Sequence, residues 1–74
     1  MKYEIELKSE VQESGDLVIQ ATASIDSAFK LSRVRHVISA YELHRSYNRQ
    51  KLIDETEARI MASALAKLKS KNSN

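Results

Sequence analysis

A single glycine, Gly15, and no proline occur in the 74 residues of this chain. Gly15 lies within a polar run, residues 13–16, and glycine reaches positive φ without a Cβ clash, so the run predicts a turn. No glycine or proline follows it, so no later residue forces a regular element to end. We therefore expect one tight turn near the N-terminus and long elements beyond it.

Apolar residues alternate with polar ones on both sides of this turn, which predicts an antiparallel β-hairpin over residues 2–25. A three-residue loop at 14–16 pairs residue 13 with residue 17 and sets Val11 opposite Ile19 and Leu7 opposite Ala23. This register gathers the odd-numbered apolar residues on one face. The small Ala21 indicates that a helix lies close over that face.

Residues 26–49 are interpreted as one long helix, with Asp26 or Ser27 as its N-cap. At 100° per residue its apolar side chains form two stripes rather than one. The first contains Leu31, Val34, Val37, Ile38 and Tyr41, and the second contains Phe29, Ala40, Leu43 and Tyr47, joined by His36. A helix that is apolar on two sides lies between two layers, and the second layer is either another helix or another subunit.

A second helix is predicted from residue 52, after a polar stretch at 46–51. Its apolar side chains share one arc at helical spacing: Ile53, Ile60, Met61, Ala64, Leu65 and Leu68. Acidic residues come early and lysines late, as the helix dipole favours. The arc lies ~155° from the first stripe of the preceding helix. This offset favours a turn near 48–51 over one continuous helix, which would need a partner to cover its far side.

The predicted fold is therefore α+β, a two-stranded antiparallel hairpin over 2–25 followed by helices over 27–48 and 52–69. We expect one domain over residues 1–70, with a polar tail at 71–74. A chain of this length buries only ~60% of its unfolded surface, and no cysteine is present to add a disulfide. We therefore expect homodimerisation to complete the fold and to cover the exposed sheet edges.

Composition excludes several classes of protein. The longest apolar run is three residues, Leu17 to Ile19, so no membrane span is expected. The N-terminal sequence lacks the apolar core of a secretory signal, and we predict a cytoplasmic protein. His36 and His44 are eight residues apart and cannot bind one metal ion from a single helix. With no catalytic, metal-binding or cofactor-binding motif, we expect neither an enzyme nor a cofactor.

Charge is unevenly distributed along the chain. Residues 1–26 contain two lysines and six acidic residues, whereas residues 27–53 contain six basic residues and one acid, Glu42. The two segments either attract each other within one fold or across a dimer, or the basic one binds nucleic acid or an acidic protein surface.

Tyrosine and arginine, the residues enriched at binding hot spots, gather in the basic segment. We predict a small non-enzymatic adaptor, inhibitor or regulator that binds a larger protein, of the kind found as accessory proteins in bacteria or phages. The alternative is a nucleic-acid-binding protein that uses the basic helix and the lysine-rich C-terminus. The predicted partner-binding residues are Arg33, Arg35, Tyr41, Arg45, Tyr47 and Arg49.

Overall fold

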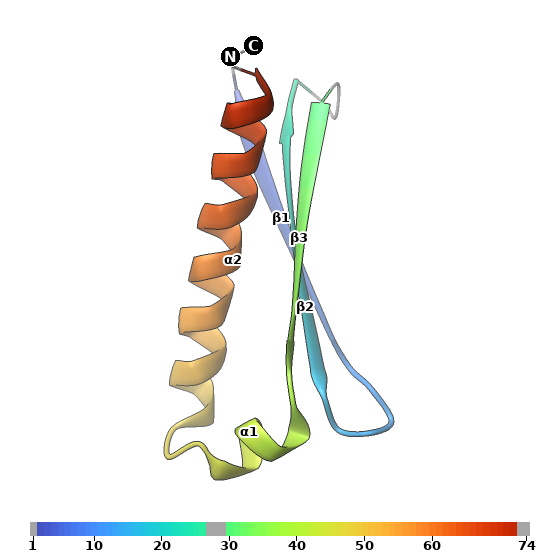
Figure 1. Ribbon diagram of the computed structural model, residues 1–74, viewed down its shortest axis with the longest axis vertical. Helices are drawn as coiled ribbons and strands as arrows, with labels where there is room; N and C mark the ends of the chain where they lie inside the picture. The colour runs from blue at the N-terminus through green and yellow to red at the C-terminus, as the bar shows by residue number, and fades with distance from the viewer. Residues whose placement is uncertain (1, 27–29, 73–74) are drawn as a thin grey trace.

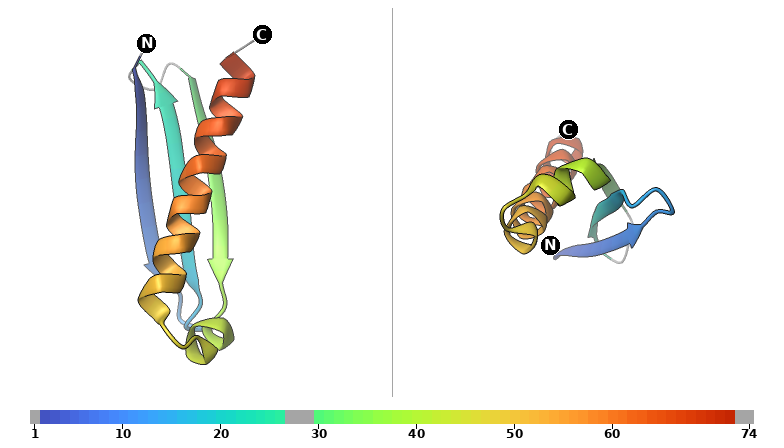
Figure 2. Two further views of the ribbon diagram at one scale, coloured as in Figure 1. Left: turned by 90° about the vertical axis from the view of Figure 1, so that its left-hand side faces the viewer. Right: turned by 90° about the horizontal axis from the view of Figure 1, so that it is seen from below.

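Three strands and two helices follow one another in the computed structural model, which describes residues 2–26 and 30–72. The elements are β1 (Tyr3–Val11), β2 (Leu17–Ile25), β3 (Lys30–Ile38), α1 (Ala40–Arg45) and α2 (Arg49–Asn72). The strands form one antiparallel sheet in the order β1-β2-β3. α2 runs along one face of the sheet, and α1 joins β3 to α2 at one end (Figures 1 and 2). The fold is α+β with an open sheet face opposite α2.

β2 is the central strand, and every odd-numbered side chain on it is buried beneath α2. These residues are Leu17, Ile19, Ala21, Ala23 and Ile25. Ile38 of β3 and three residues of α2 complete the core: Ile60, Ala64 and Leu68. The α2 residues recur every four positions, so they lie on one side of the helix. The small side chains of Ala21 and Ala23, both fully buried, let the helix approach the sheet closely.

The predicted register of the hairpin is wrong by two residues. The Gln12 N–H donates to the Asp16 carbonyl at 2.8 Å and the Gly15 N–H donates to the Gln12 carbonyl at 2.9 Å, so the loop is 13–15 rather than 14–16. Gly15 is its last residue, with φ +92°. A three-residue hairpin loop places its positive-φ residue last, and this requirement fixes the position of the glycine. Val11 therefore pairs with Leu17, although odd residues still oppose odd ones.

The predicted two-stranded sheet and the helix over 27–48 are also wrong. Residues 30–38 form β3, and only 40–45 of the expected span are helical before α2. Asp26, one predicted N-cap, has φ +50° before the third strand, and the alternative cap Ser27 and Phe29 lie outside the described residues. The physical reason is that a third strand supplies hydrogen bonds to the second edge of β2. β-branched Val34, Val37 and Ile38 suit that strand.

The expectation that homodimerisation completes the fold loses its basis with this correction. The second apolar stripe belonged to a helix that does not form. Within one chain, β1 and β3 pair with both edges of β2. α2 then covers the buried face of that strand. No second copy is required to bury the core.

Two separate helices, rather than one continuous helix, follow the sheet. Ser46, in extended conformation, ends α1. The Asn48 side-chain oxygen accepts the Lys51 N–H at 3.1 Å and caps α2. α2 begins three residues before the predicted position 52 and ends three residues after 69, so residues 71–72 of the predicted tail are helical and 73–74 lie outside the described residues. Neither helix in the described chain is long and apolar enough to cross a membrane.

Alanine substitutions at Ile38 and Val37 test whether this segment is a strand or the predicted helix. Ile38 is fully buried, whereas Val37 is 41% exposed on the open face. We expect Ile38→Ala to lower the free energy of unfolding by about 2–4 kcal/mol and Val37→Ala by less than about 1 kcal/mol. Urea denaturation measures both. The predicted helix put both residues in one core stripe, so equal losses would contradict the strand.

Candidate interaction surface

The segment that follows β3 is held in place by two hydrogen bonds to side chains. Ser39 is extended, and its hydroxyl accepts the Glu42 N–H at 3.0 Å, which starts α1. The Asp16 carboxylate accepts the Ala40 N–H at 2.7 Å in a partly buried position. The loop between β1 and β2 is thereby joined to the start of α1. Gly15 stands close to the same point, since a Cβ there would be 3.1 Å from the Cβ of Ala40.

Tyr41 and Arg45 form a pair on the exposed side of α1. The Arg45 guanidinium lies 5.4 Å from the centre of the Tyr41 ring and donates to the Tyr41 hydroxyl at 3.3 Å. α1 has no buried residue, and 67% of the Tyr41 surface is exposed. The pair therefore presents an aromatic face and a cation to solvent in a defined arrangement.

Tyr47 and Arg49 lie just beyond, where the chain turns from α1 into α2. Tyr47 is fully exposed. The Arg49 side chain reaches back, and its Nε donates to the Leu43 carbonyl at 3.2 Å. This bond satisfies one of the carbonyls left free near the end of α1. We call Tyr41, Arg45, Tyr47 and Arg49 together the α1 corner.

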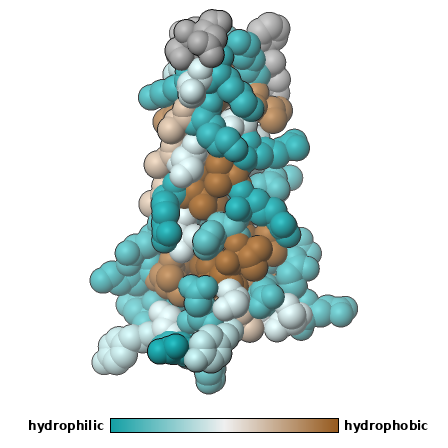
Figure 3. Space-filling model, viewed as in Figure 1, coloured by the Kyte–Doolittle hydropathy of each residue, from teal (hydrophilic) through white to brown (hydrophobic). Residues whose placement is uncertain are grey.

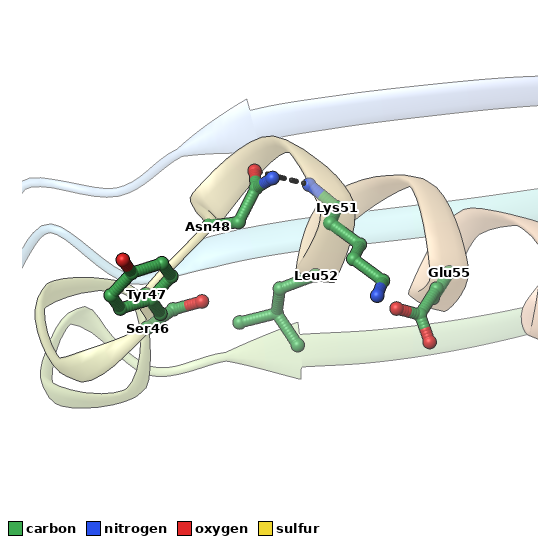
Figure 4. A pocket seen from close by; sticks show the side chains of 6 residues that line it. All are labelled: Ser46, Tyr47, Asn48, Lys51, Leu52 and Glu55. Atoms are coloured by element: carbon green, nitrogen blue, oxygen red, sulfur yellow. Dashed lines mark hydrogen bonds between the residues drawn. The ribbon is translucent and has the colours of Figure 1, made fainter.

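An open pocket of about 420 Å³ adjoins the α1 corner. Figure 4 shows the side chain of Leu52 directed toward the 46–47 turn, and the side chain of Lys51, from the same helical turn, extending toward Glu55. The volume is within the range of small-ligand sites, and the pocket is open to solvent, so it has room for one or two side chains of a partner. Its lining residues are Ser46, Tyr47, Asn48, Lys51, Leu52 and Glu55.

The structure divides the predicted partner-binding residues into two groups. Four of them form the α1 corner, and Arg33 and Arg35 lie on β3. Tyr41, Arg45 and Arg49 recur every four residues, and on the predicted long helix they would form one continuous ridge. Only the Tyr41–Arg45 contact exists, because α1 ends at Arg45. Sequence reasoning did not identify the pocket residues of α2. The only signal for them was the polar break at 46–51.

Charges are separated across the open face of the sheet. The register aligns Glu6, Thr22 and Arg33 in one row, and Lys8, Gln20 and Arg35 in the next. The outer strands are about 10 Å apart. Among the described residues the one ion pair joins Lys8 and Glu6, 3.7 Å apart on β1 itself. The acidic and basic segments therefore do not neutralise each other, and both edges of the sheet keep their charge.

The two histidines lie on different elements, His36 on β3 and His44 on α1. The premise that they share one helix was therefore wrong. Nowhere in residues 2–26 and 30–72 do three metal-ligating side chains come together.

No protein-family model, curated protein or solved structure matches this chain. The assignment of function therefore rests on the surfaces of the molecule alone.

The hydrogen bond from Ala40 to Asp16 is expected to hold the α1 corner in place. Asp16→Ala removes the acceptor, and we expect the free energy of unfolding to fall by about 1–2 kcal/mol. Hydrogen exchange at the Ala40 amide should accelerate more than exchange in the centre of β2. Asp16→Asn keeps a side-chain oxygen and should retain most of the protection. Equal exchange in the native chain and in Asp16→Ala would show that the bond does not hold α1.

Proposed function

We propose that this chain is a small non-enzymatic interaction protein, an adaptor, inhibitor or regulator, that binds a larger protein through the α1 corner. The observation that carries the proposal is the exposure of two tyrosines, Tyr41 and Tyr47, at one end of the molecule. Large aromatic side chains are costly to leave in water without a role, and tyrosine and arginine dominate binding hot spots.

The contacts within the corner also support binding. Arg45 is held by the Tyr41 hydroxyl and Arg49 by the Leu43 carbonyl. Side chains that are already ordered lose less entropy when a partner arrives, so more of the contact energy appears as affinity. The adjoining pocket offers room for a side chain of that partner.

The proposal includes the cellular setting expected from the sequence. A chain without cysteine fits a reducing compartment, and we propose a cytoplasmic accessory protein that works without a cofactor. The partner is another protein. Homo-oligomerisation, which the sequence analysis also predicted, is measured separately by sedimentation so that it is not mistaken for partner binding.

Photocrosslinking from the corner tests the proposal. Benzoylphenylalanine replaces Tyr47, whose full exposure leaves room for it, and in a control chain it replaces the exposed Lys67 of α2. In cells of the source organism we expect one protein to be crosslinked from position 47 and not from position 67. The purified partner is then titrated with the native chain.

The double variant Tyr41→Ala/Arg45→Ala should raise the Kd for that partner at least ~30-fold, the loss of about 2 kcal/mol expected for a hot spot. Its free energy of unfolding should change by less than about 1 kcal/mol, because both side chains are exposed. The matched control is Arg59→Ala/Lys67→Ala on α2, which should bind normally. A folded corner variant with unchanged affinity would exclude the α1 corner as the binding site.

Nucleic-acid binding is the second candidate, favoured by a different observation. β3 begins at the end of the molecule where α2 finishes (Figure 1), so Lys30 lies at the same end as the three lysines of the last helical turns. These are Lys67, Lys69 and Lys71. Against this candidate, β1 begins at that end too and carries Glu4 and Glu6, which repel phosphates.

Salt dependence distinguishes this candidate from protein binding. Contacts from about four cations to phosphates predict a loss of roughly 100-fold in affinity for labelled DNA or RNA between 50 and 200 mM salt. Fluorescence anisotropy measures it, with Lys69→Ala/Lys71→Ala as the variant and Arg45→Ala/Arg49→Ala as the control. Absence of binding at 50 mM salt would remove this candidate.

A further inference from the structure

β3 is a free edge of the sheet over nine residues, Lys30–Ile38. It hydrogen-bonds to β2 on one side, and within the described residues no strand lies on its other side. The outward N–H and C=O groups of such an edge are a template for another extended chain. An edge of this length can pair with a segment of similar length.

The charge on this edge selects for an acidic chain. β3 carries Lys30, Arg33 and Arg35 and no acidic residue. Arg33 and Arg35 are exposed on the open face of the sheet, on the side away from α2. A strand added next to β3 would place alternate side chains beside these guanidiniums, where glutamate or aspartate is stabilised and lysine is repelled.

Apolar surface lies on both sides of the same strand. Leu31 and Val37 are exposed on the open face, and Val34 on the other side is only partly buried. Figure 3 shows apolar side chains open to solvent along the seam between α2 and the sheet at β3. An added strand with apolar side chains on its inner face would cover part of this seam.

We propose that the outer edge of β3 binds an extended acidic segment of a partner protein as a fourth strand of the sheet. The segment alternates acidic side chains toward Arg33 and Arg35 with apolar side chains toward α2. This inference rests on the proposed function, since β3 leads through Ser39 directly into the α1 corner and one partner can contact both.

A second copy of this chain is a poorer occupant than a separate acidic segment. β1 has suitable chemistry, with Glu4, Glu6 and Glu10 on one face, although Lys8 interrupts them. However, β1 of one copy against β3 of the next is a head-to-tail contact that leaves free edges at both ends and propagates into fibres. Charged edges are a known device against such growth.

Peptides of about nine residues, the length of β3, test the proposal directly. One alternates valine and glutamate, and its control alternates valine and lysine. Each is titrated into the isotope-labelled full chain and followed by NMR. We expect the glutamate peptide to bind saturably, to shift the β3 amides and to slow hydrogen exchange at alternate β3 positions, and we expect no binding of the lysine peptide.

Backbone methylation separates strand addition from simple charge attraction. Two further glutamate peptides carry N-methyl groups on either the valines or the glutamates, which leaves the charge unchanged. In an added strand only one of these two sets of N–H groups points at β3, so one peptide should lose binding at least tenfold and the other should keep it. Equal binding of both would overturn the fourth strand.

In the variant Arg33→Glu/Arg35→Glu, the affinity for the glutamate peptide should fall at least tenfold, and the lysine peptide should bind. Arg59→Glu/Lys67→Glu, the same charge change on α2, should behave as the native chain. If charge reversal unfolds the protein, the variant Arg33→Gln/Arg35→Gln should still bind the glutamate peptide more weakly than the native chain does. Absence of peptide binding at millimolar concentration, shifts confined to β1, or concentration-dependent fibres of the native chain at its β3 edge would each overturn the proposal.

Failure here is distinguishable from failure of the proposed function. The peptide contacts β3 alone, so Tyr41→Ala/Arg45→Ala should leave its affinity within twofold of the native value. A partner crosslinked from position 47 together with no peptide binding would retain the α1 corner and remove the β3 edge. If the peptide binds and Tyr41→Ala/Arg45→Ala binds the partner with unchanged affinity, the β3 edge is retained and the α1 corner is removed.

Discussion

Burial of one face of β2 beneath α2 is the constraint on which the rest of this structure depends. Five alternate side chains of β2 are buried there, and each fully buried isoleucine or leucine contributes about 1.5–3 kcal/mol. The helix can approach this closely only because Ala21 and Ala23 occupy the middle of the strand. β1 and β3 then satisfy the backbone of β2 on both edges. α2, about 36 Å long, covers the full length of strands that span about 30 Å.

This arrangement determines where the exposed aromatic residues lie. After β3 the chain must reverse and return along the sheet, and α1 is the short piece that makes the reversal. It contributes no fully buried residue, and it is held by the partly buried Leu43 and by hydrogen bonds from its own N–H groups to the Ser39 and Asp16 side chains. Its exposed side chains are therefore available to a partner. The α1 corner lies at an end of the molecule that these contacts hold in place.

Strand order separates the charges of the sheet. β2 lies between the acidic β1 and the basic β3, so the outer strands are too far apart for direct ion pairs across the open face. Each edge keeps its own potential. The basic strand β3 is followed, after Ser39, by α1, so the two proposed binding regions are consecutive in the chain although they lie on different elements.

The sequence by itself determined the elements whose apolar residues recur with a period that fits only one type of secondary structure. Alternation on both sides of Gly15 specified the hairpin and the face that it buries, and the arc of Ile60, Ala64 and Leu68 specified α2. Tyr41 and Arg45 have the four-residue spacing of neighbours on one helical face, and the two side chains are in contact.

Only the tertiary structure decided the state of residues 30–38 and, with it, the separation of Arg33 and Arg35 from the α1 corner. The apolar residues of that segment recur at helical spacing and are divided between the two faces of the strand, so their period did not indicate a strand. The second edge of β2 decided that residues 30–38 form a strand, because the backbone groups of that edge need hydrogen-bond partners. Pairing between strands depends on residues that are close in space, and no local sequence pattern encodes it.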